Sequence, residues 1–342
     1  MRGYAVARAD TVMAGTNMGG PTLERPADFS GRDWKAVMMR VWTCIGEDNI
    51  SLIAAGCAFY SVLALFPGIT ALVLIYGLVA DPAQVSAQLA QLEGILPADV
   101  LTMIKDQMTR VAGQNESALG WGLVVAVGFA FWSASAGMKA IFTALNIAYK
   151  EREKRNILVF NLLGLLFTVM AILAVIVGLV AIVVVPAVLA FVGLGGVFEW
   201  SLRIARWPLL AVIVALGLAV LYRYGPSRAT ARWEWLTWGS TIATLIWLAA
   251  SIGFAIYVAS FASYNATYGS LGAPVVLLMW FYITAFAVLL GAEINGELEH
   301  QTSIDTTTGP SKPMGRRGAY MADHVAGQSL ADNGEPRERH HE

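Results

Sequence analysis

The residues of this 342-residue chain best placed to do chemistry are polar side chains that interrupt long apolar stretches. Burying such a group in hydrocarbon costs free energy unless it pairs or lines a cavity, so each one marks a candidate site. Two prolines, Pro67 and Pro186, are predicted to kink or break the helices that carry them, because proline lacks the N–H that a helix requires. The candidate cavity-lining or substrate-contacting residues are Tyr60, Ser61, Lys139, Arg223, Glu293 and Asn295.

The charged candidates have two interpretations. In the first, Lys139 or Arg223 lies near the inner leaflet and meets the headgroup of an anionic amphiphile. Arg would grip a phosphate through a forked pair of hydrogen bonds, whereas Lys would act as a point charge. In the second, Lys139 extends its ammonium to the headgroups of the membrane surface. A separate structural alternative is that Glu293 pairs with Lys139 or Arg223 and fixes the register of the helices.

Residue types that several classes of enzyme need are missing from the apolar stretches. No metal-binding spacing such as H-E-x-x-H occurs, and Cys44 and Cys57 flank the start of the first stretch, which excludes a Cys-based metal framework. Ser270 has no histidine base and is interpreted as a helix N-cap. We predict a non-enzymatic protein without a metal, a cofactor or a nucleic-acid partner. The histidines all lie at or beyond the end of the last stretch: His300, His324, His340 and His341.

The elements that carry the candidate residues are six apolar stretches, each long enough for a helix to cross the hydrocarbon core, which takes about 20 residues. Overall, 57% of the residues are hydrophobic and 14% are charged, whereas soluble domains average about 25% charged residues. We predict an all-α, polytopic membrane protein. Its six transmembrane helices are Leu52–Val79, Leu119–Phe142, Ile157–Val185, Ile204–Tyr222, Leu236–Phe261 and Leu271–Glu293.

Basic residues predict the orientation of these helices. The segments before, between and after them, counted together with Arg206 at the outer end of the fourth helix, carry 18 Lys and Arg on one side of the membrane and 4 on the other. Because basic segments stay inside, both termini are predicted to be cytoplasmic. Residues 157–198 are uncharged, and a hairpin of two spans there would give seven crossings but place Arg223, Arg228 and Arg232 outside. We therefore predict six crossings, the third broken at Pro186.

Amphipathic segments flank the first span. Between the first two spans, residues 85–111 predict two short interfacial helices, or helices packed on the bundle. The polar, aperiodic ends are predicted to be disordered. The chain thus divides into a tail (1–30), a membrane domain (31–300) and a second tail (301–342). A helix in the inner-leaflet interface before the first span is predicted from an apolar face that contains Trp34, Val37, Met38, Val41, Trp42 and Ile45.

Short motifs occur in order along the membrane domain: A-A-G-C-A-F-Y-S and L-F-P-G within 54–68, F-W-S and L-N within 131–146, L-Y-R-Y-G-P at 221–226, and Y-G-S-L-G and G-A-E-I-N within 268–295. In this combination the chain, over residues 32–298, resembles the YihY/virulence factor BrkB family of bacterial inner-membrane proteins. Trp238-Gly239 stands where the family has Pro-Gly. The resemblance implies an envelope role, with links to serum resistance and to export of lipid or lipopolysaccharide precursors. Family members were once labelled ribonuclease BN, a name regarded as a misassignment.

These observations predict an integral inner-membrane protein that transports or exports an amphiphilic, lipid-like envelope compound. Its expected partners are membrane lipids and that substrate, and the sequence indicates no oligomeric state. A non-transporting scaffold for envelope assembly is the main alternative. A ribonuclease is a distant third, because no metal site is encoded. A cavity lined by Tyr60, Lys139 and Glu293 would favour transport, whereas a solid, Leu-packed bundle with a partner-sized groove would favour the scaffold.

Overall fold

The computed structural model describes residues 23–79, 116–180, 197–260 and 272–326. Within these ranges the protein is helical, and its β-structure is limited to one isolated bridge between Ala231 and Thr307. The predicted all-α class is confirmed. Three predicted features, the helices of 85–111, the break at Pro186 and the N-cap at Ser270, lie outside the described residues.

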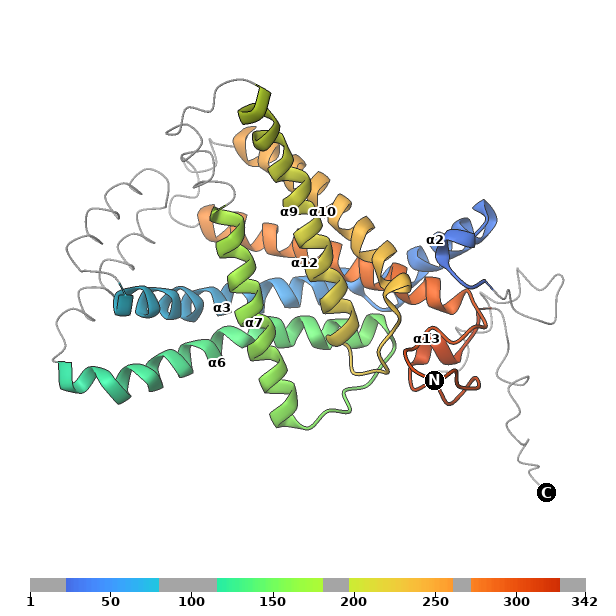
Figure 1. The fold of residues 1–342 in the computed structure, drawn as a ribbon, viewed down its shortest axis with the longest axis horizontal. Helices are drawn as coiled ribbons and strands as arrows, with labels where there is room; N and C mark the ends of the chain where they lie inside the picture. Colours follow the sequence, from blue (N-terminus) through green and yellow to red (C-terminus); the bar gives the residue numbers. More distant parts are fainter. Residues whose placement is uncertain (1–22, 80–115, 181–196, 261–271, 327–342) are drawn as a thin grey trace.

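Long helices form the body of the described structure (Figure 1): α3 (Ile50–Val79), α6 (Glu116–Ala148), α7 (Ile157–Leu179), α9 (Val197–Tyr224), α10 (Trp233–Ser260) and α12 (Gly272–His300). The shortest of them, α7, has 23 residues, and at about 1.5 Å per residue it is about 35 Å long. That length exceeds the hydrocarbon core of a bilayer, which is about 30 Å thick. Asn156 begins α7, because its side chain accepts a hydrogen bond from the Val159 N–H at 2.8 Å.

By length and composition, five of these helices contain a segment able to cross a membrane: Ile50–Pro67, Ile157–Gly178, Trp207–Tyr224, Trp233–Val258 and Pro274–His300. Pro67 lies inside α3, and the helix continues through it. The remaining long helix, α6, is continuous over 33 residues. Six crossings with both termini on one side therefore stay a prediction.

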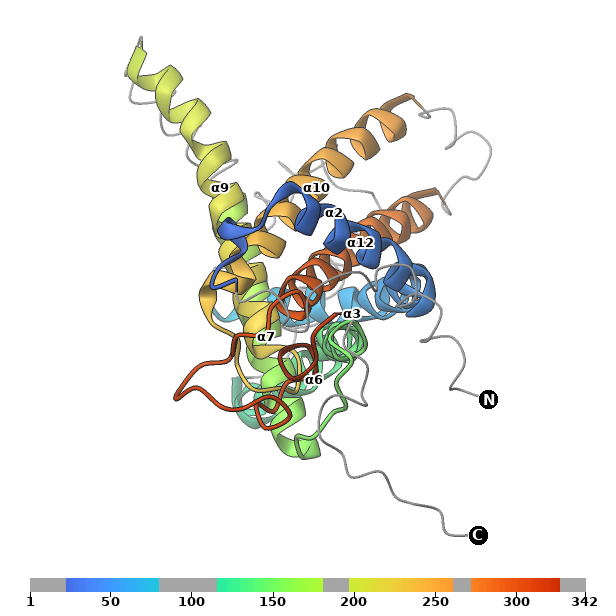
Figure 2. The same cartoon turned by 90° about the vertical axis from the view of Figure 1, so that its right-hand side faces the viewer.

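The long helices converge at one end and splay apart toward the other (Figures 1 and 2). The chain direction alternates from helix to helix, so the first residues of α3, α7 and α10 meet the last residues of α6, α9 and α12 at the convergent end, called here the polar end. The main contacts join α3 to α6 and α12, α10 to α9 and α12, and α6 to α7. Large core side chains lie almost fully enclosed near the polar end, among them Phe142, Tyr149, Tyr222 and Trp235.

The predicted amphipathic helix before the first span is α2 (Gly31–Glu47). It begins at Ser30 with a capping box: the Ser30 hydroxyl accepts from the Asp33 N–H at 3.4 Å, and the Asp33 carboxylate accepts from the Ser30 N–H at 2.8 Å. One edge of the helix packs against α12. The opposite edge does not pack on the bundle, since Trp42 there is 79% exposed. An exposed apolar edge of this kind is typical of a helix that lies in a membrane interface. The buried edge consists of Val37, Val41 and Cys44.

The structure describes part of each predicted tail, residues 23–30 and 301–326. Residues 301–326 fold onto the polar end and include the short helix α13 (Tyr320–Asp323), in which Met321 is fully buried. Residues 23–30 pack through Phe29 against Trp235. Internal hydrogen bonds order the polar segment after α12, and hydrophobic periodicity does not detect them. The Arg317 guanidinium donates to the carbonyls of Ser303, Ile304, Lys312 and Ala322.

Candidate functional site

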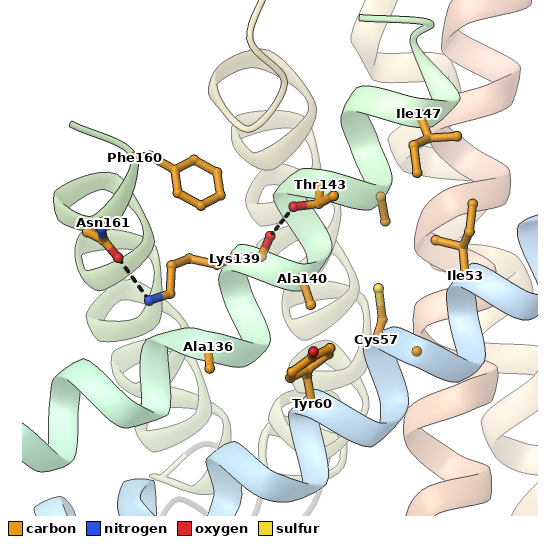
Figure 3. A pocket seen from close by; sticks show the side chains of 12 residues that line it. Ile53, Cys57, Tyr60, Ala136, Lys139, Ala140, Thr143, Ile147, Phe160 and Asn161 are labelled. Atoms are coloured by element: carbon orange, nitrogen blue, oxygen red, sulfur yellow. Dashed lines mark hydrogen bonds between the residues drawn. The ribbon is translucent and has the colours of Figure 1, made fainter. Parts of the chain in front are cut away.

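A groove opens on the side of the bundle near the polar end, between α3, α6 and α7 (Figure 3). Its volume is about 620 Å³, which is the size of a small-molecule site. Tyr60 and Ile147 line it and are 49% and 38% exposed, so the groove is open to the surroundings of the bundle. Its walls are mostly apolar, and Tyr60, Lys139, Thr143 and Asn161 supply polar side-chain atoms.

Small side chains create the groove. Ala136, Ala140 and Ala144 recur every four residues on α6 and therefore share one face of that helix. Beside this face α3 and α6 approach closely, because a Cβ added at Gly137 would lie only 3.3 Å from the Ser61 Cα. The close contact thus holds the two helices together while the alanines leave space next to it.

Lys139 is the cation of the groove, and its side chain is held in place from three sides. Its Nζ donates to the Asn161 Oδ1 at 2.9 Å, and it lies 4.9 Å from the centre of the Trp132 ring. The Asn161 Nδ2 donates to the Ile157 carbonyl at 2.8 Å, which turns the Oδ1 of Asn161 toward Lys139. The aliphatic stem of Lys139 lies against Gly164, where a Cβ would come within 2.8 Å of the Lys139 Cγ. Figure 3 shows this side chain reaching from α6 to α7.

The charge of Lys139 has no acidic partner in the part of the chain that the structure describes. Among the residues that the structure describes, no carboxylate lies within ion-pair distance of the Lys139 Nζ. A neutral amide and an aromatic face attract the ammonium without cancelling its charge. The groove can therefore accept an anionic group beside Lys139 and apolar groups along its walls.

The other predicted site residues do not join Tyr60 and Lys139. The Ser61 hydroxyl donates to the Cys57 carbonyl at 2.8 Å, at the contact of α3 with α6. Arg223, in the last turn of α9, donates to the Ala231 carbonyl and lies 4.6 Å from the centre of the Trp233 ring. These two residues therefore have packing roles in the described structure.

Asn295 fixes the crossing of α10 and α12. Its Oδ1 accepts from the Gly239 N–H at 2.9 Å. A Cβ at Gly239 would lie 2.3 Å from that oxygen and 2.4 Å from the Gly291 carbonyl oxygen, so the helices can meet here only through glycine. From α9, the Tyr222 hydroxyl donates to the Val288 carbonyl at 2.7 Å beside this crossing. Two of the sequence motifs, L-Y-R-Y-G-P and G-A-E-I-N, thus meet at one packing point.

Glu293 lies apart from the groove. Its side chain is completely buried, and neither carboxylate oxygen has a hydrogen-bond partner. No ion pair joins it to Lys139 or Arg223 in the described part of the chain, so the structure does not show the predicted pairing. The groups that face it come instead from α2 and the turn after it, namely Cys44 and Asp48.

Sequence reasoning missed Asn161, although a signal was present. Asn161 is the sole amide side chain in the apolar stretch 157–185, and a polar side chain at that depth marks a contact or a cavity. The buried ion pairs of the polar end were also missed, because their partners lie far apart in the sequence. Arg40 pairs with Glu297 at 2.5 Å, and Arg228 pairs with Glu299 at 2.5 Å.

The fold and the groove define a multi-pass α-helical membrane protein with a lateral groove that carries one cation. A family model described as Virulence factor BrkB matches residues 41–315 of the chain. The chain belongs to this family, and the resemblance predicted from its motifs is confirmed.

Relatives of the chain are bacterial. The ribonuclease-like protein YfkH of Bacillus subtilis (strain 168) is 28% identical over 73% of this chain and 90% of its own length. The UPF0761 membrane protein PBPRA3489 of Photobacterium profundum is 27% identical over 78% of this chain and 81% of its own length. The UPF0761 membrane protein Bxeno_A3061 of Paraburkholderia xenovorans is 26% identical over 74% of this chain and 57% of its own length. No solved structure matches the chain. The protein is a multi-pass bacterial membrane protein.

Proposed function

We propose that this protein transports or exports an anionic, lipid-like envelope compound and binds it in the groove between α3, α6 and α7. The observation that carries the proposal is the ammonium of Lys139, which has no acidic partner among the described residues and lies in a mostly apolar groove. An amphiphile has the two matching parts. Its acyl chain would lie against the alanines and isoleucines of the walls, and its anionic headgroup would reach Lys139.

The position of Lys139 along its helix supports this assignment. Lys139 lies nine residues before Ala148, the last residue of α6, which places it about 14 Å from that end of the helix. We further propose that the polar end faces the cytoplasm, because the 18 basic residues of the predicted inner segments obey the positive-inside rule. The cation would then lie close to the inner boundary of the hydrocarbon core, within reach of a lipid headgroup.

The groove favours transport over a purely structural scaffold. A scaffold is expected to have a solid, Leu-packed bundle with a groove the size of a protein partner, whereas this groove, with a volume of about 620 Å³, has the size of a small-molecule site. We propose a non-enzymatic role. The Thr143 hydroxyl in this groove donates to the Lys139 carbonyl at 3.0 Å, and no histidine lines the site to activate a hydroxyl.

The proposal is tested by replacing the groove cation in cells that depend on the protein for an envelope phenotype, such as lipid-precursor export or serum resistance. Lys139→Ala is expected to impair the phenotype while the amount of protein in the membrane stays at the wild-type level. Lys35→Ala, which removes an exposed lysine of α2 outside the groove, is the matched control and should leave both unchanged.

Arg223→Ala provides a structural contrast. It removes the guanidinium that bonds the Ala231 carbonyl and stacks on Trp233, so it should lower protein abundance together with the phenotype. The proposal is wrong if Lys139→Ala keeps a wild-type phenotype at wild-type abundance. It is equally wrong if Lys139→Ala lowers phenotype and abundance in the same proportion as Arg223→Ala, because Lys139 would then be a packing residue.

A further inference from the structure

Three potential metal ligands meet at the polar end, outside the groove. The Cys44 Sγ, a carboxylate oxygen of Asp48 and a carboxylate oxygen of Glu293 all lie within 4.8 Å of one another. Cys44 and Asp48 are four residues apart at the end of α2 and therefore lie on the same side of that helix. The Asp48 N–H donates to the Cys44 carbonyl at 2.9 Å, and Asn49, with a φ of 52°, turns the chain into α3. Glu293 comes from α12 and closes the site.

The carboxylates at this site lack the partners that burial demands. Glu293 is completely buried, and both of its carboxylate oxygens are without a hydrogen bond. The Asp48 Oδ2 is also buried without a partner. A carboxylate removed from water in this way is strongly unfavourable unless a positive charge or a proton compensates it. Glu293 therefore requires either a proton or a bound cation that neutralises it.

Among the described residues, three basic side chains of the polar end, Arg40, Arg228 and His300, are engaged with other acids, and Lys150 is not. The Arg40 guanidinium binds Glu297 at 2.5 Å, and the His300 ring nitrogen lies 3.5 Å from the same carboxylate. The Arg228 guanidinium binds Glu299 at 2.5 Å. Lys150 lies near the cluster, but no carboxylate in the described ranges is within ion-pair distance of its ammonium. The cluster thus holds more acid than base.

In contrast to the metal-free protein predicted from the sequence, we propose that Cys44, Asp48 and Glu293 bind a divalent transition-metal ion of the zinc type. One thiolate and two carboxylates match the ligands that zinc accepts, and the sulfur ligand disfavours magnesium and calcium, which prefer oxygen alone. On metal binding the Cys44 thiol, whose Sγ donates to the Glu297 Oε1 at 3.6 Å in the structure, would release its proton to the solvent. The ligands would then carry three negative charges, the ion two positive charges, and the nearby ammonium of Lys150 one. Charge at the buried site is then balanced.

The geometry requires a small adjustment. Zinc binds sulfur at about 2.3 Å and oxygen at about 2.0–2.2 Å with tetrahedral angles, which puts the ligand atoms about 3.5 Å apart. The ligand atoms, at most 4.8 Å apart, need to close by roughly 1 Å, within the reach of a side-chain rotation. A metal here would join α2, the turn after it and α12. It would fix the amphipathic helix on the bundle.

The test is metal binding by the full-length protein, purified in detergent through an affinity tag without histidine and with His340 and His341 replaced by alanine. After incubation with zinc and removal of free metal, inductively coupled plasma mass spectrometry is expected to find one zinc ion per chain. Glu293→Gln and Cys44→Ser should each lower this content severalfold. Cys57→Ser, a buried cysteine outside the cluster, and Glu47→Gln, an exposed acid beside it, are the matched controls and should keep the zinc.

Two further measurements separate a metal from a proton on Glu293. With cobalt in place of zinc, the protein should show the near-ultraviolet charge-transfer band of a cobalt–thiolate bond, absent in Cys44→Ser. Zinc should raise the thermal midpoint of the wild type and not that of Glu293→Gln. Size-exclusion chromatography checks that each variant is folded. Equal metal content in the wild type and in a folded Glu293→Gln variant would overturn the site, and Glu293 would then be buried in its protonated form.

Discussion

The buried ion pair between Arg228 and Glu299 offers the most quantitative test of how the polar end is held together. The Arg228 Nη2 lies 2.5 Å from the Glu299 Oε2, and the two side chains are only 2% and 0% exposed. The guanidinium also lies 5.0 Å from the centre of the Tyr149 ring, and the Thr306 hydroxyl donates to the same Glu299 oxygen at 2.7 Å. The pair therefore joins the loop between α9 and α10, the end of α12 and the segment after it.

Removing one partner of a buried ion pair costs about 3–5 kcal/mol, because the remaining charge is left without compensation. Arg228→Met keeps much of the apolar stem of the side chain and strands Glu299. We therefore expect the free energy of unfolding to fall by about 3–5 kcal/mol, which is a factor of roughly 10²–10⁴ in the unfolding equilibrium. In the double variant Arg228→Met/Glu299→Gln no charge remains, and the Thr306 hydroxyl can still bond the amide oxygen. The double variant should recover most of the loss.

The assay is equilibrium unfolding in mixed micelles with increasing dodecyl sulfate, followed by the fluorescence of the 11 tryptophans. Lys35→Met, at an exposed lysine of α2, is the control for loss of a basic residue and should change the free energy of unfolding by less than about 0.5 kcal/mol. The reasoning is refuted if Arg228→Met unfolds at the same detergent fraction as the wild type. A double variant no more stable than Arg228→Met would refute it as well.

Two further predictions concern packing and pH. Gly239→Ala is expected to destabilise the protein by about 1–3 kcal/mol, because the added Cβ would lie 2.3 Å from the Asn295 Oδ1. The same unfolding titration measures this loss, and Gly253→Ala, at a site with open space, is the control. Equal stability of the two variants would contradict the prediction. Hydrogen bonds from the Arg155 side chain hold the pKa of Glu153 at about 2, below its ordinary value of 4.5. A carboxyl whose pKa is lowered on folding stabilises the protein above its unfolded pKa, so this contribution should be complete above about pH 4.5 and disappear as the pH falls toward 2. Glu153→Gln should remove that part of the pH dependence, and an unchanged unfolding profile between pH 5 and 3 would show that the Arg155 contact adds nothing.

Hydropathy predicted the long helices because membrane crossing imposes length and apolarity on each segment separately. It also selected Lys139 and Tyr60 as cavity residues, since a polar group in an apolar stretch needs a reason to be there. Both residues line the groove. Asn161, the partner of Lys139, is likewise a polar side chain in an apolar stretch, that of α7. The order of the helices along the chain does not predict that α6 and α7 bring these two residues to the same depth.

The partners of Glu293 and the fold of residues 301–326 were beyond the reach of sequence patterns. Cys44 and Asp48 reach Glu293 only because α2 packs on α12, a contact between opposite ends of the chain. Residues after α12 are polar and aperiodic, yet Arg317 orders them by bonding four carbonyls. Hydrophobic periodicity indicates which faces of a helix or strand are buried. A loop ordered by hydrogen bonds and a cluster of acidic residues distant in sequence leave no such periodic pattern.

Capture of lipid inside the groove tests the central claim most directly. A photoreactive phenylalanine analogue at Ile147, which lines the groove, and at Ile252, which is 63% exposed on α10, would be crosslinked in native membranes. The attached lipids would then be identified by mass spectrometry. The account predicts that the Ile147 position captures anionic lipid in excess over its share of the membrane, and that Lys139→Ala abolishes this excess while capture at Ile252 stays unchanged. Identical lipid profiles at the two positions, or an excess at Ile147 that survives Lys139→Ala, would contradict it.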